Sequence, residues 1–229
     1  MSQNQIALRQ AFKAIKDRYA SEGRSNIVTP SDLRLEVKIS QNKTTYQFFA
    51  LQQDTNPDFA GGSSNTEIRL NQNDSFHAVL AGLYCASPSS DTSAEFALAS
   101  YPNPNMFTAA RAAAYQMIFN NSFVNININN VQYIQKMSTA RFRNVGVSQL
   151  GLGATSSTAA PADIPSTLVD QFNGNDDGLT SLGSIIEVSG QKKSDIQLVL
   201  PSGLSQAPGS YDRLIFMFRG YLALNAATR

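Results

Sequence analysis

The sequence predicts a mainly all-β protein, an antiparallel sandwich or barrel with one helix at the front and one inserted in the middle. Short apolar runs alternate with turn-rich clusters and give about eight to ten expected strands, without alternation of strand and helix. The clearest signal is the end of the chain, where residues 195–201 and 211–224 form two strand-like runs joined by a loop with Pro and Gly. The second run is entirely apolar from Leu214 to Phe218, which predicts a strand covered on both faces.

The other elements follow from local patterns. Between Leu33 and Ile39 every second residue is aliphatic and the residues between them are charged, which predicts a half-buried strand. In the middle of the chain, Asn103 can cap a helix and Pro104 suits its first position, so the Ala-rich stretch to Phe119 is expected to be helical. Further strands are expected at residues 46–51, across a turn at 41–43, and at residues 66–70, 75–85, 123–129, 131–137, 140–147 and 185–188.

Residues 1–26 are expected to form a helical arm, distinct from a β-domain of residues 27–229. An amphipathic helix is predicted over residues 4–22, because apolar side chains recur on one face and Gly23 can end the helix. Three interpretations stay open: the helix lies on the core of its own domain, docks as an assembly arm on a neighbouring subunit, or contacts a membrane or nucleic acid. The apolar stripe is Leu8, Phe12, Ile15 and Tyr19, and the basic residues are Arg9, Lys13, Lys16, Arg18 and Arg24.

The composition favours association with other protein surfaces. Only 15% of the 229 residues are charged, and the formal net charge is +1. A polar but weakly charged surface does little to repel copies of itself, although Asn- and Ser-rich loops also occur in ordinary β-proteins. Cys85 is the only cysteine, so no intrachain disulfide can form. The first residues lack the apolar core of a secretion signal and no apolar stretch is long enough to cross a membrane, so we expect a soluble protein made in the cytoplasm.

The sequence offers little for catalysis. His77 is the only histidine, so a Ser-His-Asp or Cys-His arrangement would need it as the base. Cys85 follows on the same expected strand, roughly 26 Å away, which excludes a local pair. A His/Cys metal site lacks ligands, and no phosphate-binding glycine loop is present. We therefore expect no enzymatic activity and no cofactor, with His77 a structural residue.

Residues 151–184 form a long stretch of low complexity, which predicts a loop that is functional or mobile. Within it, Asn173, Asn175 and Asp177 alternate as in the first half of a calcium loop. Ser184 occupies the position where such a loop needs a bidentate glutamate, so consecutive Asx turns explain the pattern equally well.

Arg141 and Arg143 flank Phe142 and form a basic and aromatic cluster. Such a cluster can stack on bases or bind phosphate. An ordinary strand whose phenylalanine faces the core gives the same pattern, and we favour that interpretation.

The helical arm, the short strands with an inserted helix and the long late loop resemble the jelly-roll coat proteins of icosahedral viruses and tailless bacteriophages. Residues 196–201 and 212–225, ending in Arg219-Gly-Tyr-Leu-Ala-Leu-Asn225, look like the closing strands of such shells. The resemblance covers residues 30–229 as a pattern, and the chain is too short for two jelly-rolls. It implies a single jelly-roll capsid subunit without catalysis, present in many copies per shell.

The resemblance implies copies of the same chain as the main partner, other virion proteins as further partners, and no small-molecule substrate. It also implies a place in the virion, with the basic residues of the arm facing the genome. Two alternatives stay open: a tail, neck, spike or fibre component, and a β-sandwich that binds a glycan or receptor. The latter would use exposed aromatic residues, for which Tyr101, Tyr115 and Tyr133 are candidates.

Overall fold

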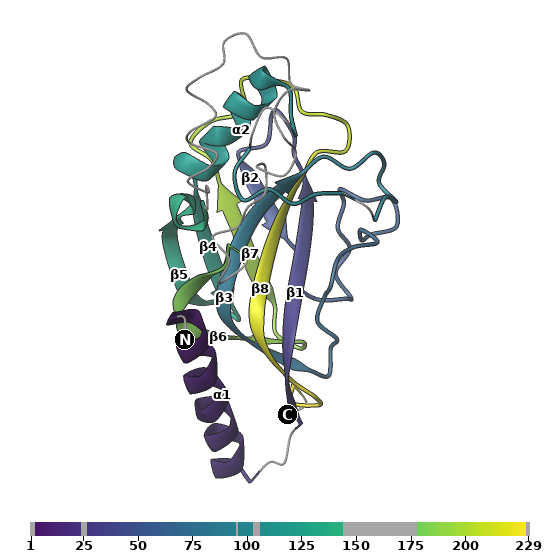
Figure 1. Cartoon of the computed structure of the whole chain (residues 1–229). Coiled ribbons are helices and arrows are strands. Elements are labelled where there is room, and N and C mark those ends of the chain that lie inside the picture. The colour runs from purple at the N-terminus through teal and green to yellow at the C-terminus, as the bar shows by residue number, and fades with distance from the viewer. Residues whose placement is uncertain (1–2, 24–26, 95, 103–105, 144–177, 228–229) are drawn as a thin grey trace.

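The computed structural model describes residues 3–23, 27–94, 96–102, 106–143 and 178–227. Two four-stranded antiparallel sheets pack face to face (Figure 1), which confirms the mainly β sandwich expected from the sequence. The first sheet, called here the covered sheet, contains in spatial order β1 (Val28–Lys38), β8 (Arg213–Ala223), β3 (Ser75–Ala86) and β6 (Thr180–Ser189). The second, the open sheet, contains β2 (Thr45–Phe48), β7 (Ser194–Val199), β4 (Phe123–Ile128) and β5 (Val131–Ser138). The helices are α1 (Gln3–Ser21), α2 (Ala109–Asn120) and a 3₁₀ turn, η1 (Thr139–Phe142).

The strands pair from the middle of the strand order outwards. β4 pairs with β5, β3 with β6, β2 with β7 and β1 with β8, so the partners lie progressively further apart in sequence. Contacts between β3 and β8 and between β4 and β7 then join these pairs into the two sheets. The turn at residues 41–43 therefore makes no hairpin, because it carries the chain from β1 in one sheet to β2 in the other. The two strands at the end of the chain, β7 and β8, likewise belong to different sheets.

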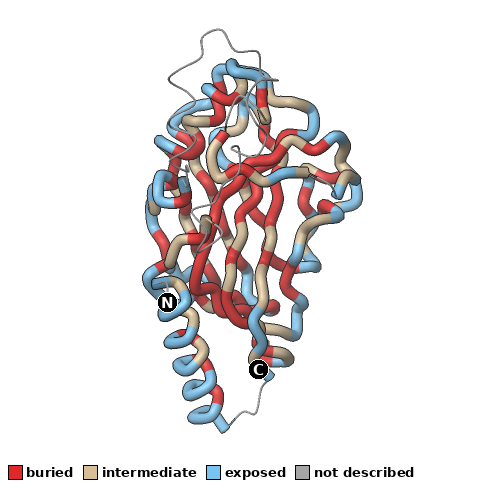
Figure 2. Tube along the Cα trace, in the orientation of Figure 1, coloured by how far each residue is buried: buried red, intermediate tan, exposed pale blue. Residues whose placement is uncertain are grey.

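The core lies between the sheets and is rich in aromatic rings. Phe216 of β8 contacts Phe48 of β2, Phe142 of η1 and its neighbour Phe218, with ring centroids 5.5, 5.6 and 4.6 Å apart. Ile215 points out of the opposite face of the sheet and is buried as well. This confirms that the apolar run in the last strand is covered on both faces. Buried segments run through the centre of the sandwich along β3 and β8 (Figure 2).

The exposed edge of β1 is closed by the loop of residues 52–74. The backbone N–H and C=O of Arg34 bond with those of Ile68, both at 2.9 Å. The backbone N–H of Glu36 donates to the carboxylate of Glu67 at 3.1 Å. A sheet edge with free N–H and C=O groups is a template for pairing with another strand. The loop bonds to such groups of Arg34 and Glu36, so this part of the edge is no longer open to another strand.

A buried arginine fixes the covering loops to the outer face of β1 and β8. The guanidinium of Arg213 donates to the carboxylate of Glu36 at 2.9 Å and to the carbonyl of Ser90 at 3.1 Å. The rings of Phe59 and Phe96 flank the guanidinium at 5.1 and 5.6 Å. Arg213 and Glu36 are both fully buried. Loss of one partner from such a pair leaves an uncompensated buried charge. The contacts of Arg213 with Ser90, Phe59 and Phe96 also tie two loops to the sheet.

Helix α2 closes one end of the sandwich (Figure 1). Tyr115 and Phe119 are fully buried, and the hydroxyl of Tyr115 donates to the carboxylate of Asp212 at 2.6 Å. The helix begins at Ala109, later than predicted, because Phe107 leaves the helical path and packs its ring on Tyr115 at 5.1 Å. The expected cap, Asn103, and the following Pro104 lie outside the described residues.

Three segments differ from the sequence prediction. Residues 66–70 form only isolated bridges, because they satisfy the edge of β1 and the backbone near residue 51. Residues 139–142 form a 3₁₀ turn where an extended strand was expected, and the turn directs Phe142 into the core. β6 starts at Thr180, inside the expected loop of residues 151–184, and the part of that loop up to residue 177 lies outside the described residues.

Candidate functional site

The candidate site is the N-terminal helix α1 and the part of the covered sheet on which it lies (Figure 1). Ile15 and Tyr19 of the predicted apolar stripe are buried, and Leu8 and Phe12 are half-buried. The stripe packs against the outer face of β3, β6 and β8, with Val79, Leu179, Tyr221 and Ala223 as partners. In this chain the helix therefore lies on its own domain, which was the first of the three interpretations open from the sequence. Its end also agrees with the prediction, since Gly23 follows in a left-handed conformation with φ +68°.

Polar contacts hold α1 along its whole length. Near its start, the side-chain amide of Asn4 donates to the carbonyl of Leu179 at 2.9 Å. In the middle, the hydroxyl of Tyr221 donates to the carbonyl of Leu8 at 2.9 Å. Near its end, Arg18 donates to the carboxylate of Glu187 at 2.7 Å, and the hydroxyl of Tyr19 lies 2.8 Å from Nε2 of His77. Sequence patterns gave no signal for Glu187 and Tyr221, because each acts through a contact across the fold. Four residues hold the C-terminal end of the helix: Arg18, Tyr19, His77 and Glu187.

His77 lies beneath the last turn of α1. Phe76 and Ala78 face the core between the sheets, so His77, between them on β3, faces α1. Its ring is 1% exposed and meets the ring of Tyr19 edge-on at 5.7 Å. Burial lowers the pKa of His77 from its usual 6.5 to about 4; the nearby Glu187 carboxylate opposes this shift and Arg18 adds to it. The imidazole is thus held neutral in the folded chain.

Cys85 and His77 lie eight positions apart on β3, as expected, and their side chains also point to opposite faces of the sheet. A β-bulge between Ala78 and Leu80 shifts the register of β3. Beyond the bulge Cys85 points into the core between the sheets, on the face opposite His77. Burial raises the pKa of its thiol well above the usual range, so the thiol stays protonated. The sulfur is 3.5 Å from the carbonyl of Ala99.

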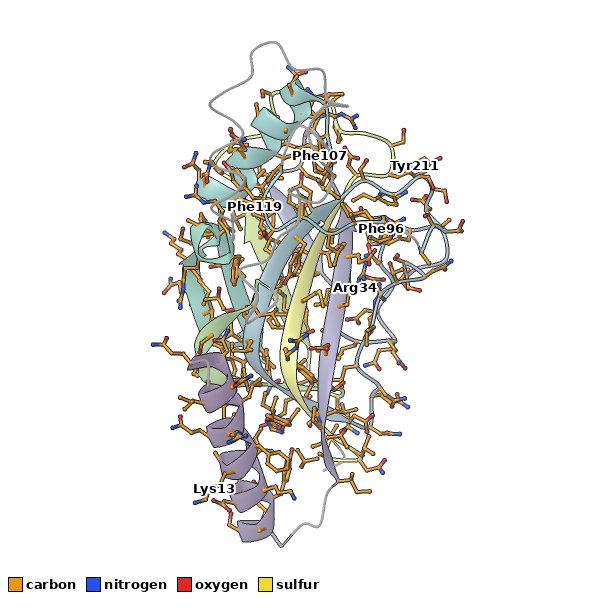
Figure 3. All side chains as sticks on the ribbon, viewed as in Figure 1. Lys13, Arg34, Phe96, Phe107, Phe119 and Tyr211 are labelled. Atoms are coloured by element: carbon orange, nitrogen blue, oxygen red, sulfur yellow. The ribbon has the colours of Figure 1, made fainter. Side chains whose placement is uncertain are left out.

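The basic residues of α1 lie mostly away from the sheet. Arg9, Lys13 and Lys16 are exposed, and Figure 3 shows Lys13 on the outer side of the helix. Arg18 is different, because its guanidinium bonds to Glu22 at 3.2 Å as well as to Glu187. The fifth basic residue of the segment, Arg24, lies outside the described residues. The helix therefore buries its apolar face and presents positive charge on its outer face.

Two cavities flank the docked helix. One, of about 260 Å³, lies between α1 and β6, and the other, of about 190 Å³, lies between α1 and the start of β1. Both have apolar and small side chains from the helix and from the sheet in their walls. Wall residues include Ala7, Ala11, Ala14, Val79 and Ile185 in the first cavity, and Leu8, Pro30 and Tyr221 in the second.

The aromatic residues considered for glycan binding do not form a common surface. Tyr115, on the core-facing side of α2, is fully buried, so the prediction of an exposed ring was wrong. Tyr101 is half-buried, with the ring of Phe119 at 6.0 Å and the guanidinium of Arg143 at 5.4 Å. Tyr133 is 43% exposed on β5.

The remaining candidates from the sequence lie apart from this site. Phe142 is buried in the core, while Arg141 donates to the carbonyl of Ser181 and Arg143 to the side chain of Asn120. In the described part of the chain, no His, Cys, Asp and Glu residues cluster in a way that could hold a metal ion. The calcium candidates, Asn173, Asn175 and Asp177, fall outside that part. No helix among the described residues has the length and apolar character needed to cross a membrane.

The position of His77 predicts an acid-sensitive stability. The unfolded chain binds a proton on this imidazole near pH 6.5, whereas the folded chain, with Tyr19, Arg18, Glu187 and Tyr221 around the ring, does so only near pH 4. The His77 contribution to the free energy of unfolding is therefore complete above pH 6.5 and is lost as the pH falls towards 4, by up to about 3 kcal/mol.

The measurement is chemical denaturation of the wild type and of His77→Gln between pH 4 and pH 8. Glutamine does not titrate and can keep the hydrogen bond to Tyr19. The difference in free energy of unfolding between the two proteins should change between pH 6.5 and pH 4 and should be constant above pH 6.5. Parallel profiles over the whole range would show that His77 does not control acid stability.

Comparison of the chain with models of protein families, with characterised proteins and with solved structures finds no match. Function is accordingly inferred from the fold and from the surfaces that the chain itself presents.

Proposed function

We propose that the chain is a self-assembling capsid subunit of a virus or bacteriophage, built on a single jelly-roll. The observation that carries this proposal is the strand order, β1-β8-β3-β6 in one sheet and β2-β7-β4-β5 in the other. A jelly-roll consists of eight antiparallel strands in two sheets, and the nested pairing of eight strands in this order supports the proposal. Viral coats are among the main uses of that architecture, alongside lectins and cupins.

The surface chemistry supports assembly over the other uses of the fold. Only 15% of the residues are charged, which leaves little repulsion between copies. The edge of β1 is closed by its own loop, so copies would not extend the covered sheet at that edge. Stable interfaces of this kind bury about 1,200–2,000 Å² each, and a closed shell multiplies weaker ones.

Helix α1 supports the arm role in this proposal. It lies on the covered sheet through one apolar stripe and a few polar contacts, and it leaves cavities on two sides. The same stripe of Leu8, Phe12, Ile15 and Tyr19 can bind the equivalent surface of a neighbouring copy, because the two surfaces are identical. The helix would then link subunits while its outer, basic side faces the genome inside the virion.

The alternative of a tail, neck, spike or fibre component shares the self-association but differs in the shape of the product. A glycan-binding sandwich is less well supported, since Tyr115 is buried and Tyr101 is covered on one side by Arg143. These alternatives predict different assemblies, which makes the test direct.

The first prediction is that the purified chain forms closed shells, because copies of a jelly-roll subunit associate through several surfaces. Negative-stain microscopy at increasing protein concentration and at low and moderate salt checks it. Rings or stacked tubes would support the tail or neck alternative. A chain that stays monomeric at every concentration and salt tested would contradict any assembly role.

The second prediction concerns the genome. Arg9→Gln combined with Lys13→Gln removes two exposed positive charges of α1 and should weaken nucleic-acid binding, since each charge releases counterions from phosphate. The slope of log K against log salt should become shallower by about 1.4 for single strands or about 1.8 for a duplex.

The matched control is Lys192→Gln combined with Lys193→Gln, which removes two exposed charges from the turn between β6 and β7. The control should keep the wild-type slope. Equal slopes for all three proteins would contradict genome contact through α1.

A further inference from the structure

The outer face of the open sheet is polar and has few charges. Along β2, β4 and β7, outward residues alternate with buried ones, and none of the outward residues is buried. Asp195 is the only charged residue among them. The covered sheet differs, because α1 and two loops lie over its outer face. The outward residues of the open sheet are Thr45, Gln47, Phe123, Asn125, Asn127, Asp195, Gln197 and Val199.

A row of amide side chains crosses the middle of this face. Gln47 of β2 pairs in register with Gln197 of β7, and Gln197 pairs with Asn125 of β4. An amide group both donates and accepts hydrogen bonds, so a row of amides is complementary to a second copy of the same row. A row of like charges would instead repel its copy.

One positive charge joins the face from β5. The pairing of β5 with β4 shifts register opposite Asn125, and Lys136 takes a left-handed conformation there with φ +51°. Its N–H donates to the side chain of Asn125 at 2.9 Å, and its ammonium lies 6.0 Å from the centre of the Phe123 ring. The ammonium group of Lys136 therefore lies on the outer face of the open sheet, between β5 and β4.

The two charges of the face are opposite in sign and are separated by β4. Asp195 lies on β7, paired with Asn127, and Lys136 lies on β5, opposite Asn125. In a pair of copies related by a two-fold axis, each contact occurs twice. An axis close to Asn125 brings Asp195 of one copy to Lys136 of the other, and the reverse contact follows by symmetry.

We propose that a second copy of the chain docks on this face, with the two open sheets packed against each other around a two-fold axis near Asn125. The inference deepens the proposed assembly function, on which it rests, by naming one of its interfaces.

The size of the face sets the strength of the contact. Four strands of about six residues span roughly 20 by 20 Å. That area is below the roughly 800 Å² per partner of a standard interface, so an isolated pair is weak. In a shell the same contact is repeated and reinforced by the others.

The test exchanges the two charges. Asp195→Lys and Lys136→Glu, each alone, place like charges together twice in the pair and should weaken pairing about tenfold or more. The double variant restores opposite charges and should recover most of the wild-type affinity. Sedimentation equilibrium of the full chain at low salt measures the pairing, and Asp17→Lys, an exposed change on α1, is the control that should leave it unchanged.

The proposal is overturned if the single variants pair as well as the wild type, if the double variant is no better than the single ones, or if the wild type does not pair. Shell formation is scored separately by microscopy. Normal shells from Asp195→Lys would reject this interface and leave the proposed function intact. Pairing that follows the charge exchange in a chain that never forms larger assemblies would reject the proposed function and keep the interface.

Discussion

Two neighbouring strands, β3 and β8, need cover on both faces, and the rest of the fold is arranged to supply it. Every residue of β3 is buried, and most of β8 is as well. The open sheet covers their inner face. Helix α1 covers one part of their outer face, and two loops held by Arg213 cover another. A strand pair this apolar would aggregate if either cover were missing, so the arm and the loops are part of the folding unit.

The two sheets are consequently unequal. The covered sheet satisfies its outer face and the edge of β1 within the chain. The open sheet leaves an amide-rich face with two opposite charges, Asp195 and Lys136. The outer face of one sheet is thus covered within the chain and that of the other is not, and the proposed pairing of copies uses the second. The docking of α1 on the covered sheet places His77 beneath its last turn, where burial lowers the pKa of the imidazole.

Sequence patterns predicted the parts of this fold that depend on local periodicity. The alternation from Leu33 to Ile39 predicted β1, whose aliphatic residues are buried as expected, and the apolar run from Leu214 to Phe218 predicted β8, which is covered on both faces. The stripe on α1 was also recognised, because helical spacing of apolar residues reports a buried face wherever that face lies. The surface that receives the stripe depends on the strand order, and no local pattern encodes it.

The features that the sequence did not reveal arise from contacts between distant segments. The bulge in β3, which puts His77 and Cys85 on opposite faces, appears in the pairing with both of its neighbouring strands. The burial of Glu36, in a strand whose charged residues were expected to face solvent, depends on Arg213 far along the chain. Residues 66–70 looked like a strand, but they serve to close an edge. In each case tertiary contacts override a local preference.

Native-state hydrogen exchange on the isolated subunit tests the central claim, that the twice-covered strands carry the stability of the fold. We expect the backbone amides of β3 and β8 to exchange most slowly, with a free energy equal to that of global unfolding, and those of β4 and β7 to open at lower cost. Slowest exchange in β4 and β7, with β3 and β8 opening first, would contradict it.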